Sequence, residues 1–211
     1  MKTLRSAVTN SLKLVILAAG LAATPIPFDP ERGLVEVRVL LDGRVQGKFG
    51  LDTGADRLYI DRAFARKNGL SFAEGAPSHQ IVGVDGVALS SAVSLRSMEI
   101  GEERLYNLPA VAIDLNDLTH GRTGEHPDGL IGFDILRRFY LTIDYPNRTA
   151  DMYMAEPRFL SGREFETVPF RQFNHLIIVD ARFSKDIVSP MVLDYCASIT
   201  TVSNQLATEL E

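Results

Sequence analysis

The stretch that decides the fold is an aspartate loop at the end of an apolar strand: G-K-F-G-L-D-T-G-A-D, Gly47–Asp56. Because Asp52 closes the strand, its carboxyl group can lie at the bottom of a cleft, where burial and a second carboxylate would shift its pKa. Thr53 supplies a short hydroxyl group, and Gly54 permits a turn in which backbone N–H groups approach the carboxylate. Asp-Thr-Gly is also ordinary turn chemistry, so the tripeptide alone is a weak signal of function.

A second stretch, M-V-L-D-Y-C-A-S at Met191–Ser198, has the same outline with its middle changed. A single offset of 142 residues, with no gap, aligns Phe28 with Phe170 and Asp52 with Asp194. This spacing predicts an internal repeat. The second copy carries Tyr195 in place of the threonine and Cys196 in place of the glycine, so its loop is predicted to be impaired.

The residues around the two loops read as short strands. Val35–Val39 alternates apolar and polar residues as a half-buried strand does, and Asp42-Gly43 predicts a hairpin turn directly after it. A second hairpin is predicted within Ile81–Leu89, with its turn at Asp85-Gly86. One short helix is predicted from about Asp61 to Asn68-Gly69, where glycine commonly ends a helix. The pattern favours an all-β fold.

These motifs together resemble the retropepsin-like aspartic proteases. The resemblance is carried by D-T-G-A after an apolar strand, by the flap-like hairpin, and by D-G-L-I-G-F-D-I-L-R-R-F, which begins at Asp128. It covers about Ile26–Tyr153 and, more faintly, Val168–Ala207. It implies an acid-protease β-barrel lobe with a flap hairpin and one or two short helices, followed by an incomplete second lobe.

The resemblance also implies roles for individual residues. Asp52 would be a catalytic carboxylate, and the flap would fold over bound peptide. The residues implied to support the catalytic loop are Thr53, Gly54, Ala55, Leu130, Ile131 and Gly132, and those implied for the flap are Gly83, Val84, Asp85 and Gly86.

One aspartate cannot perform this reaction, so Asp52 needs a partner carboxylate. The partner is either Asp194 of the second copy or Asp52 of a second subunit in a homodimer. Tyr195 is too large for the cross-loop hydrogen bond that the family makes with threonine, and Cys196 brings a Cβ into the turn. Both changes favour the homodimer and leave Asp194 open to a plain turn role.

The predicted function is therefore that of an aspartic endopeptidase acting on peptide or protein substrates. The alternative is a protease-like module that holds peptides in its cleft without cutting them. No cofactor is implied. His120, His126 and Asp128 lie in a polar loop without a local ligand motif, so no metal site is predicted, and Cys196 is expected to be a non-catalytic thiol.

The N-terminal segment and the net charge give expectations about the location and the partners of the protein. Basic residues precede the apolar run Leu14–Ala23, which is too short for a spanning helix and is typical of a signal peptide. We expect a signal peptide at 1–23, a first lobe at 24–157 and a truncated repeat at 158–211, in an exported, periplasmic or extracellular protein. Membrane contact would come only from an uncleaved N-terminal segment. The net charge of -5 disfavours a nucleic-acid partner.

Overall fold

The structure, a computed structural model, describes residues 25–28, 34–73, 79–82, 87–116, 126–156, 166–197 and 199–210. Its helices are α1 (Arg62–Lys67), α3 (Phe133–Leu136) and α4 (Asn204–Leu210). Its strands are β1 (Ile26–Pro27), β2 (Glu36–Leu41), β3 (Val45–Leu51), β4 (Tyr59–Asp61), β5 (His79–Val82), β6 (Val87–Ile100), β7 (Glu103–Ile113), β8 (Gly129–Ile131), β9 (Tyr140–Asp144), β10 (Thr149–Tyr153), β11 (Phe170–Phe173), β12 (Leu176–Arg182) and β13 (Val188–Val192).

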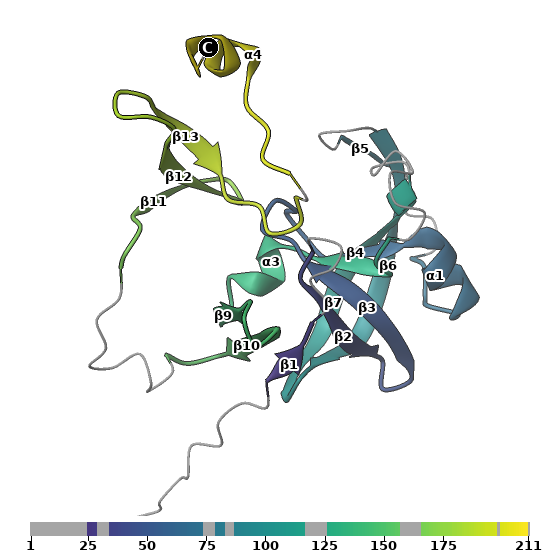
Figure 1. Cartoon of the computed structure of the whole chain (residues 1–211). Coiled ribbons are helices and arrows are strands. Elements are labelled where there is room, and N and C mark those ends of the chain that lie inside the picture. The colour runs from purple at the N-terminus through teal and green to yellow at the C-terminus, as the bar shows by residue number, and fades with distance from the viewer. Residues whose placement is uncertain are drawn as a thin grey trace, which may run out of the picture.

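The first lobe is a closed β-barrel (Figure 1). Its strands follow the order β2-β3-β8-β4-β7-β6, and a further pairing between β2 and β6 closes the ring. The largest fully buried side chains line its interior, among them Phe49, Leu51, Ile60 and Ile131. The all-β barrel lobe expected from the sequence is confirmed.

Two local predictions are also confirmed. Asp42 and Gly43 turn the chain between β2 and β3 with φ values of 51° and 68°, a conformation that suits glycine and is tolerated by aspartate. Helix α1 begins after Asp61, whose carboxylate accepts the N–H of Phe64, and it ends at Asn68 before Gly69 (φ 61°). The helix thus has the start and the stop that its sequence predicts.

A small sheet of order β1-β10-β9 lies against the barrel and was not predicted from the sequence. Ala150 and Met152 on β10 are buried in the same core as the barrel residues. Phe28 packs edge-on against Tyr145, with ring centroids 5.7 Å apart. This sheet therefore belongs to the first lobe.

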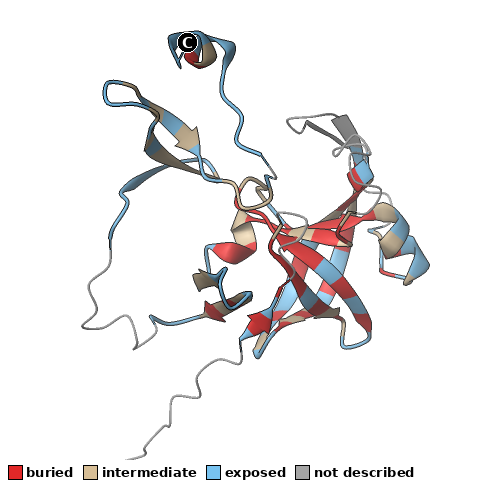
Figure 2. Cartoon of the chain, in the orientation of Figure 1, coloured by how far each residue is buried: buried red, intermediate tan, exposed pale blue. Residues whose placement is uncertain are grey.

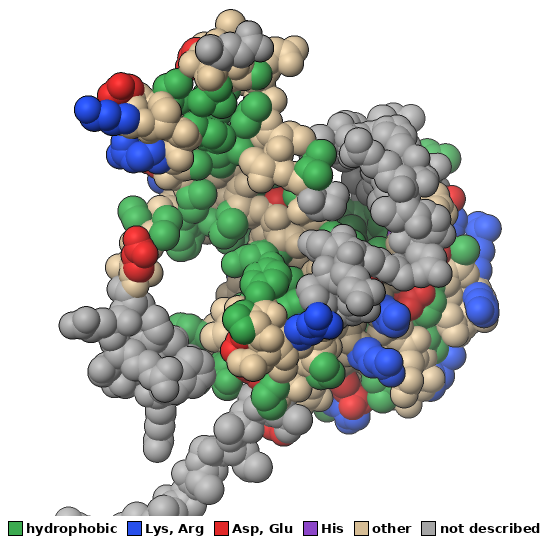
Figure 3. Space-filling view, viewed as in Figure 1, with side chains coloured by type: hydrophobic (Ala, Val, Ile, Leu, Met, Phe, Trp, Pro, Cys, Tyr) green, Lys and Arg blue, Asp and Glu red, His purple; other side chains and the backbone are tan. Residues whose placement is uncertain are grey.

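The second copy forms a separate sheet of order β11-β12-β13 followed by α4 (Figure 1). Buried residues gather in the barrel, whereas this sheet is half-buried or exposed (Figure 2). Of the described residues after 165, only Leu206 is buried. Hydrophobic side chains consequently gather on the surface of this sheet (Figure 3), and Phe170 and Phe173 are more than half exposed. The second copy has no closed core among these residues.

Hydrogen bonds repeat at the same 142-residue offset that the sequence shows. The N–H of Leu51 donates to Val35 O at 2.9 Å, and the N–H of Leu193 donates to Ile177 O at the same distance. The offset also carries α1 onto α4, whose first turn is capped by Ser203 as α1 is capped by Asp61. The internal repeat is therefore structural as well as sequential.

Several predictions fall on residues outside the described part of the chain. They are the signal peptide at 1–23, the flap residues Gly83, Val84, Asp85 and Gly86, and His120 of the polar loop. Strands β5 and β6, which flank the predicted flap turn, pair antiparallel with Val82 opposite Val87. Within the described residues, no helix has the length and apolar character to span a bilayer.

Candidate active site

Asp52 lies at the end of β3, in a loop that surrounds its carboxylate with backbone donors. Its side chain is buried, with a residue exposure of 8%. The N–H groups of Gly54 and Ala55 donate to Oδ1 at 2.8 and 2.9 Å. The loop therefore holds the carboxyl group in one orientation, with Oδ1 occupied by the backbone.

Strand β8 supports this loop from the side. The N–H of Asp52 donates to Ile131 O at 2.9 Å, and the N–H of Phe133 donates to Ala55 O at 2.8 Å. A Cβ on Gly132 would collide with the backbone of Arg57, so only glycine fits where the two segments cross. The structure thus brings the D-T-G-A and L-I-G motifs together, as the resemblance implies. Leu130 pairs with Gly50 of β3 in the same ladder.

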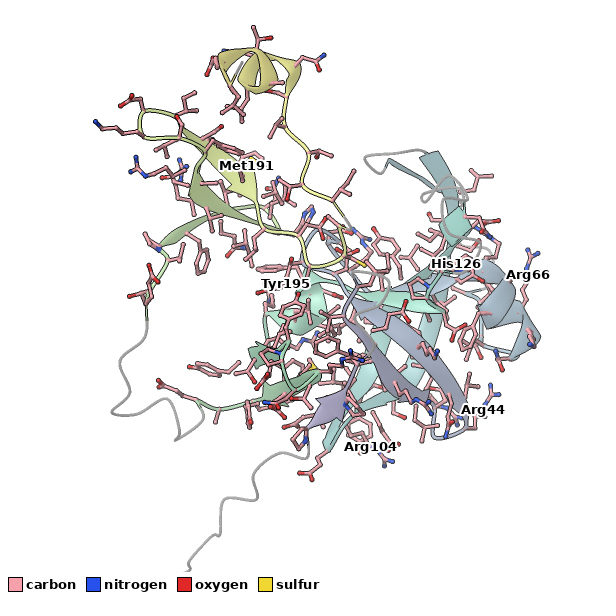
Figure 4. The ribbon with its side chains drawn as sticks, in the orientation of Figure 1. Arg44, Arg66, Arg104, His126, Met191 and Tyr195 are labelled. Atoms are coloured by element: carbon pink, nitrogen blue, oxygen red, sulfur yellow. The ribbon has the colours of Figure 1, made fainter. Side chains whose placement is uncertain are left out.

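The second aspartate loop meets the first within one chain. The Thr53 hydroxyl donates to Leu193 O at 2.7 Å and accepts the N–H of Tyr195 at 3.1 Å. Tyr195 lies at the junction between α3 and the second sheet (Figure 4). The bulk of Tyr195 does not keep the loops apart, because the Thr53 hydroxyl bonds to backbone groups of the second loop.

The two carboxyl groups, of Asp52 and Asp194, face each other across this junction. An added Cβ on Gly54 would lie 2.5 Å from Asp194 Oδ2, so the glycine makes room for the second carboxylate. Burial, the negative charge of Asp194 and a hydrogen bond between the two side chains together outweigh the backbone donors and raise the pKa of Asp52 to about 7. Asp52 can therefore keep its proton at mildly acidic pH while it lies beside a second carboxyl group.

Cys196 does not break the second loop, contrary to the expectation from its Cβ. Its N–H donates to Asp194 Oδ1 at 2.8 Å, as the N–H of Gly54 does to Asp52 in the first loop. Its Sγ lies against Gly50, where the lack of a side chain leaves space. Burial, with the charges of Asp52 and Asp194, raises the pKa of the thiol well above its usual value, which disfavours a nucleophilic role.

Two groups near the loops were missed by the sequence reasoning. His175, in the turn between β11 and β12, places Nε2 3.1 Å from Gly54 O. Asp56 accepts hydrogen bonds from Arg57 and from the Tyr59 hydroxyl, each at 2.6 Å. Asp56 is the last residue of the opening motif and could have been singled out there. No local signal marks His175, because its contact spans 121 residues.

A cavity of about 420 Å³ adjoins the paired loops at Thr53 and Tyr195, and neither Asp52 nor Asp194 lines it. Its wall is mostly apolar and comes from α3, β9, β11 and β12 together with the two loops. The lining residues are Thr53, Phe133, Leu136, Arg137, Phe139, Leu141, Ile143, Tyr145, Phe170, Gln172, Ile177 and Tyr195. Packing between the first lobe and the second sheet therefore leaves space next to Thr53 and Tyr195.

The remaining polar candidates have structural contacts. Asp128 accepts the N–H of Lys48 at 2.8 Å, and His126 Nδ1 lies 2.9 Å from Pro127 O. Asp134 lies in the first turn of α3. Across the described ranges of the chain, histidine, cysteine and acidic side chains form no group of three that could hold a metal ion.

The sequence of the barrel lobe matches a known protein family. Residues 35–135, which span the Asp52 loop and β8, match the sequence model of the aspartyl protease family. A crystal structure of a retropepsin-like aspartic protease from Rickettsia conorii is similar at 21% sequence identity, with a TM-score of 0.41. That similarity covers 62% of this chain and 88% of the other. Comparison with curated protein sequences gave no match.

Over residues 35–135 the barrel lobe of this chain is similar to the aspartyl protease family. The family resemblance inferred from the motifs is thereby confirmed.

Proposed function

We propose that this protein is an aspartic endopeptidase whose catalytic pair, Asp52 and Asp194, comes from a single chain. The observation that carries the proposal is the meeting of the two aspartate loops: Thr53 bonds to Leu193 and Tyr195, and Gly54 leaves room for the Asp194 carboxyl group. The family match supports a protease function in general, and the geometry of the pair supports the intrachain version of it.

The chemistry follows from a carboxyl pair that holds one proton. The charged carboxylate takes a proton from a water molecule, and the water oxygen attacks the carbonyl carbon of the peptide bond. The protonated carboxyl group donates its hydrogen to the carbonyl oxygen as negative charge develops there, which gives a tetrahedral diol. The carboxyl group that took the proton from water then gives it to the amide nitrogen as the C–N bond breaks, and the other carboxylate takes a hydroxyl proton from the diol as the new carboxylic acid forms. The amine and the acid leave, and the pair again holds one proton. The raised pKa of Asp52 provides the shared proton at mildly acidic pH.

The decisive experiment replaces each carboxylate separately. Asp52→Asn and Asp194→Asn should each reduce hydrolysis of a peptide library by at least about 100-fold, because each removes one partner of the acid–base pair. Asp180→Asn is the matched control, since Asp180 lies exposed on the same second sheet in an ion pair with Arg171. It should cleave peptides at the wild-type rate.

Two outcomes would redirect the proposal. Full activity in Asp194→Asn, with none in Asp52→Asn, would point to a homodimer in which two Asp52 side chains meet. Peptide binding by the wild type without hydrolysis, from pH 3 to pH 7, would instead support a non-catalytic peptide-binding module. Export of the mature protein and closure of the flap over substrate stay predictions of the sequence.

A further inference from the structure

The peptide unit between Gly54 and Ala55 carries a hydrogen bond at each end. Its N–H, on Ala55, donates to Asp52 Oδ1 at 2.9 Å, and its C=O, on Gly54, lies 3.1 Å from His175 Nε2. A carbonyl oxygen only accepts hydrogen bonds, so Nε2 must carry the hydrogen. The imidazole, the peptide and the carboxylate therefore form one chain of hydrogen bonds that ends on Asp52.

Hydrogen bonds in such a chain reinforce one another. A donor on the carbonyl oxygen polarises the peptide and makes its N–H a stronger donor, most of all where water is excluded. The N–H bonds of Ala55 and Gly54 favour the charged form of Asp52 and oppose the rise of its pKa. A hydrogen bond donated by His175 would favour the charged form of Asp52 further, and it would also hold the loop in place.

The position of His175 is defined by the turn that carries it. Asn174, with φ at 53°, turns the chain between β11 and β12, and the Gln172 side chain donates to Asn174 O at 2.7 Å. The residue is half-buried, so its ring is partly shielded from water. The imidazole is thus presented to the first loop from the second sheet.

The charged neighbour of the imidazole is Asp56, on the same loop as Gly54. Burial works against ionisation of Asp56, but hydrogen bonds from Arg57 and Tyr59 and the positive charges of Arg57 and His175 hold its pKa below the usual value. The charge of Asp56 therefore adds to the attraction between this loop and the His175 side chain. This attraction and the bond to Gly54 both draw His175 toward the loop.

We propose that His175 is a positioning residue for Asp52, acting through the Gly54–Ala55 peptide to orient the catalytic loop and to strengthen the Ala55 hydrogen bond to the carboxylate. The consequence for hydrolysis rests on the proposed function. The effect on Asp52 itself does not, because it needs no substrate.

The test compares His175→Ala with His175→Gln, whose side-chain N–H₂ can replace the Nε2–H donor. Arg171→Ala is the matched control, because it breaks an exposed ion pair on the same sheet without touching Gly54. Nuclear magnetic resonance would follow the Ala55 amide proton and the titration of the Asp52 side-chain carbon in each variant.

We expect the Ala55 amide proton to move upfield in His175→Ala and the Asp52 titration midpoint to rise by roughly half a unit. His175→Gln should retain most of the wild-type behaviour, and Arg171→Ala all of it. If the protein hydrolyses peptides, kcat in His175→Ala should fall at least about 5-fold with little change in KM, because only the orientation of the catalytic group is disturbed.

Three results would overturn the proposal. One is a wild-type Ala55 shift and Asp52 midpoint in His175→Ala. Another is His175→Gln behaving like His175→Ala. The third needs no variant and so holds even if His175→Ala fails to fold: imidazole ¹⁵N shifts of the neutral wild-type ring that place the hydrogen on Nδ1. Failure of the wild type to cleave peptides would count against the proposed function alone.

Discussion

At the scale of the residue, one side chain joins the two aspartate loops. Thr53 is buried and uses its hydroxyl both as a donor, to Leu193 O, and as an acceptor, from Tyr195 N–H. These two hydrogen bonds do not depend on which side chains the second loop carries, because both are made to its backbone. The changes at positions 195 and 196 are therefore compatible with paired loops.

Replacing Thr53 with valine should separate the loops. Valine keeps the shape but leaves a carbonyl and an N–H of the second loop without their partner, at a cost of about 1–3 kcal/mol in the free energy of unfolding. Urea unfolding followed by circular dichroism measures this loss. Thr53→Ser retains the hydroxyl and should lose less than half as much, and equal losses in the two variants would contradict the role of the hydrogen bonds.

Asp52 itself should make the protein less stable as pH rises. Its folded pKa is about 7 and its ordinary value is 3.8, so the folded state binds the proton more tightly than the unfolded chain does. The contribution to stability is complete below about pH 4 and is lost as pH rises toward 7. Asp52→Asn cannot ionise and should exceed the wild type by roughly 2–4 kcal/mol at pH 7.5.

Thermal unfolding of the wild type and of Asp52→Asn between pH 4 and pH 8 tests the predicted direction of this pH dependence. The difference in stability should shrink as pH falls from 8 to 4, because the ionised fraction of Asp52 in the unfolded chain falls as the pH approaches the ordinary pKa of 3.8. A difference that is constant with pH would mean that the asparagine acts by packing and not by removing a buried charge.

At the scale of the element, the same helix start occurs twice with different burial. Asp61 caps α1 and is itself buried, whereas Ser203 caps α4 from an exposed position. The barrel side of the repeat has a core behind its helix, and the second copy has little. Loss of the cap should therefore destabilise the protein more at α1 than at α4.

Alanine at each cap tests that difference. Asp61→Ala should cost about 1–2 kcal/mol, and Ser203→Ala about 0.5 kcal/mol or less, because the second helix is weakly coupled to the rest of the fold. Hydrogen exchange of the α1 and α4 amides, with global unfolding as a second measure, gives both values. A larger loss for Ser203→Ala would show that the second copy is the more cooperative part.

At the scale of the whole molecule, the question is whether one chain suffices for a complete carboxyl pair. The contacts from Thr53, Gly54 and His175 all run between the first lobe and the second sheet of one chain. If these contacts form the active centre, activity per molecule should be independent of protein concentration from about 1 nM to about 10 µM.

Progress curves at fixed substrate, together with the mass in solution by light scattering, measure this directly. A constant specific activity over this range is the expected result. Specific activity that falls on dilution, in step with loss of a dimer, would contradict the single-chain centre and favour pairing of Asp52 between subunits.

The sequence by itself determined the all-β class, the Asp42-Gly43 turn and the bounds of α1, because turn chemistry, capping and strand alternation act between near neighbours in the chain. The 142-residue repeat could also be found there, because the two copies keep the same spacing between matching residues. It also identified Asp52 and Asp194 as candidates. Only the tertiary structure decided how the loops meet. Tyr195 is tolerated because the contact uses its backbone, Cys196 because Gly50 leaves it space, and His175 reaches Gly54 across 121 residues. Such contacts depend on how distant segments pack, and no local pattern encodes them.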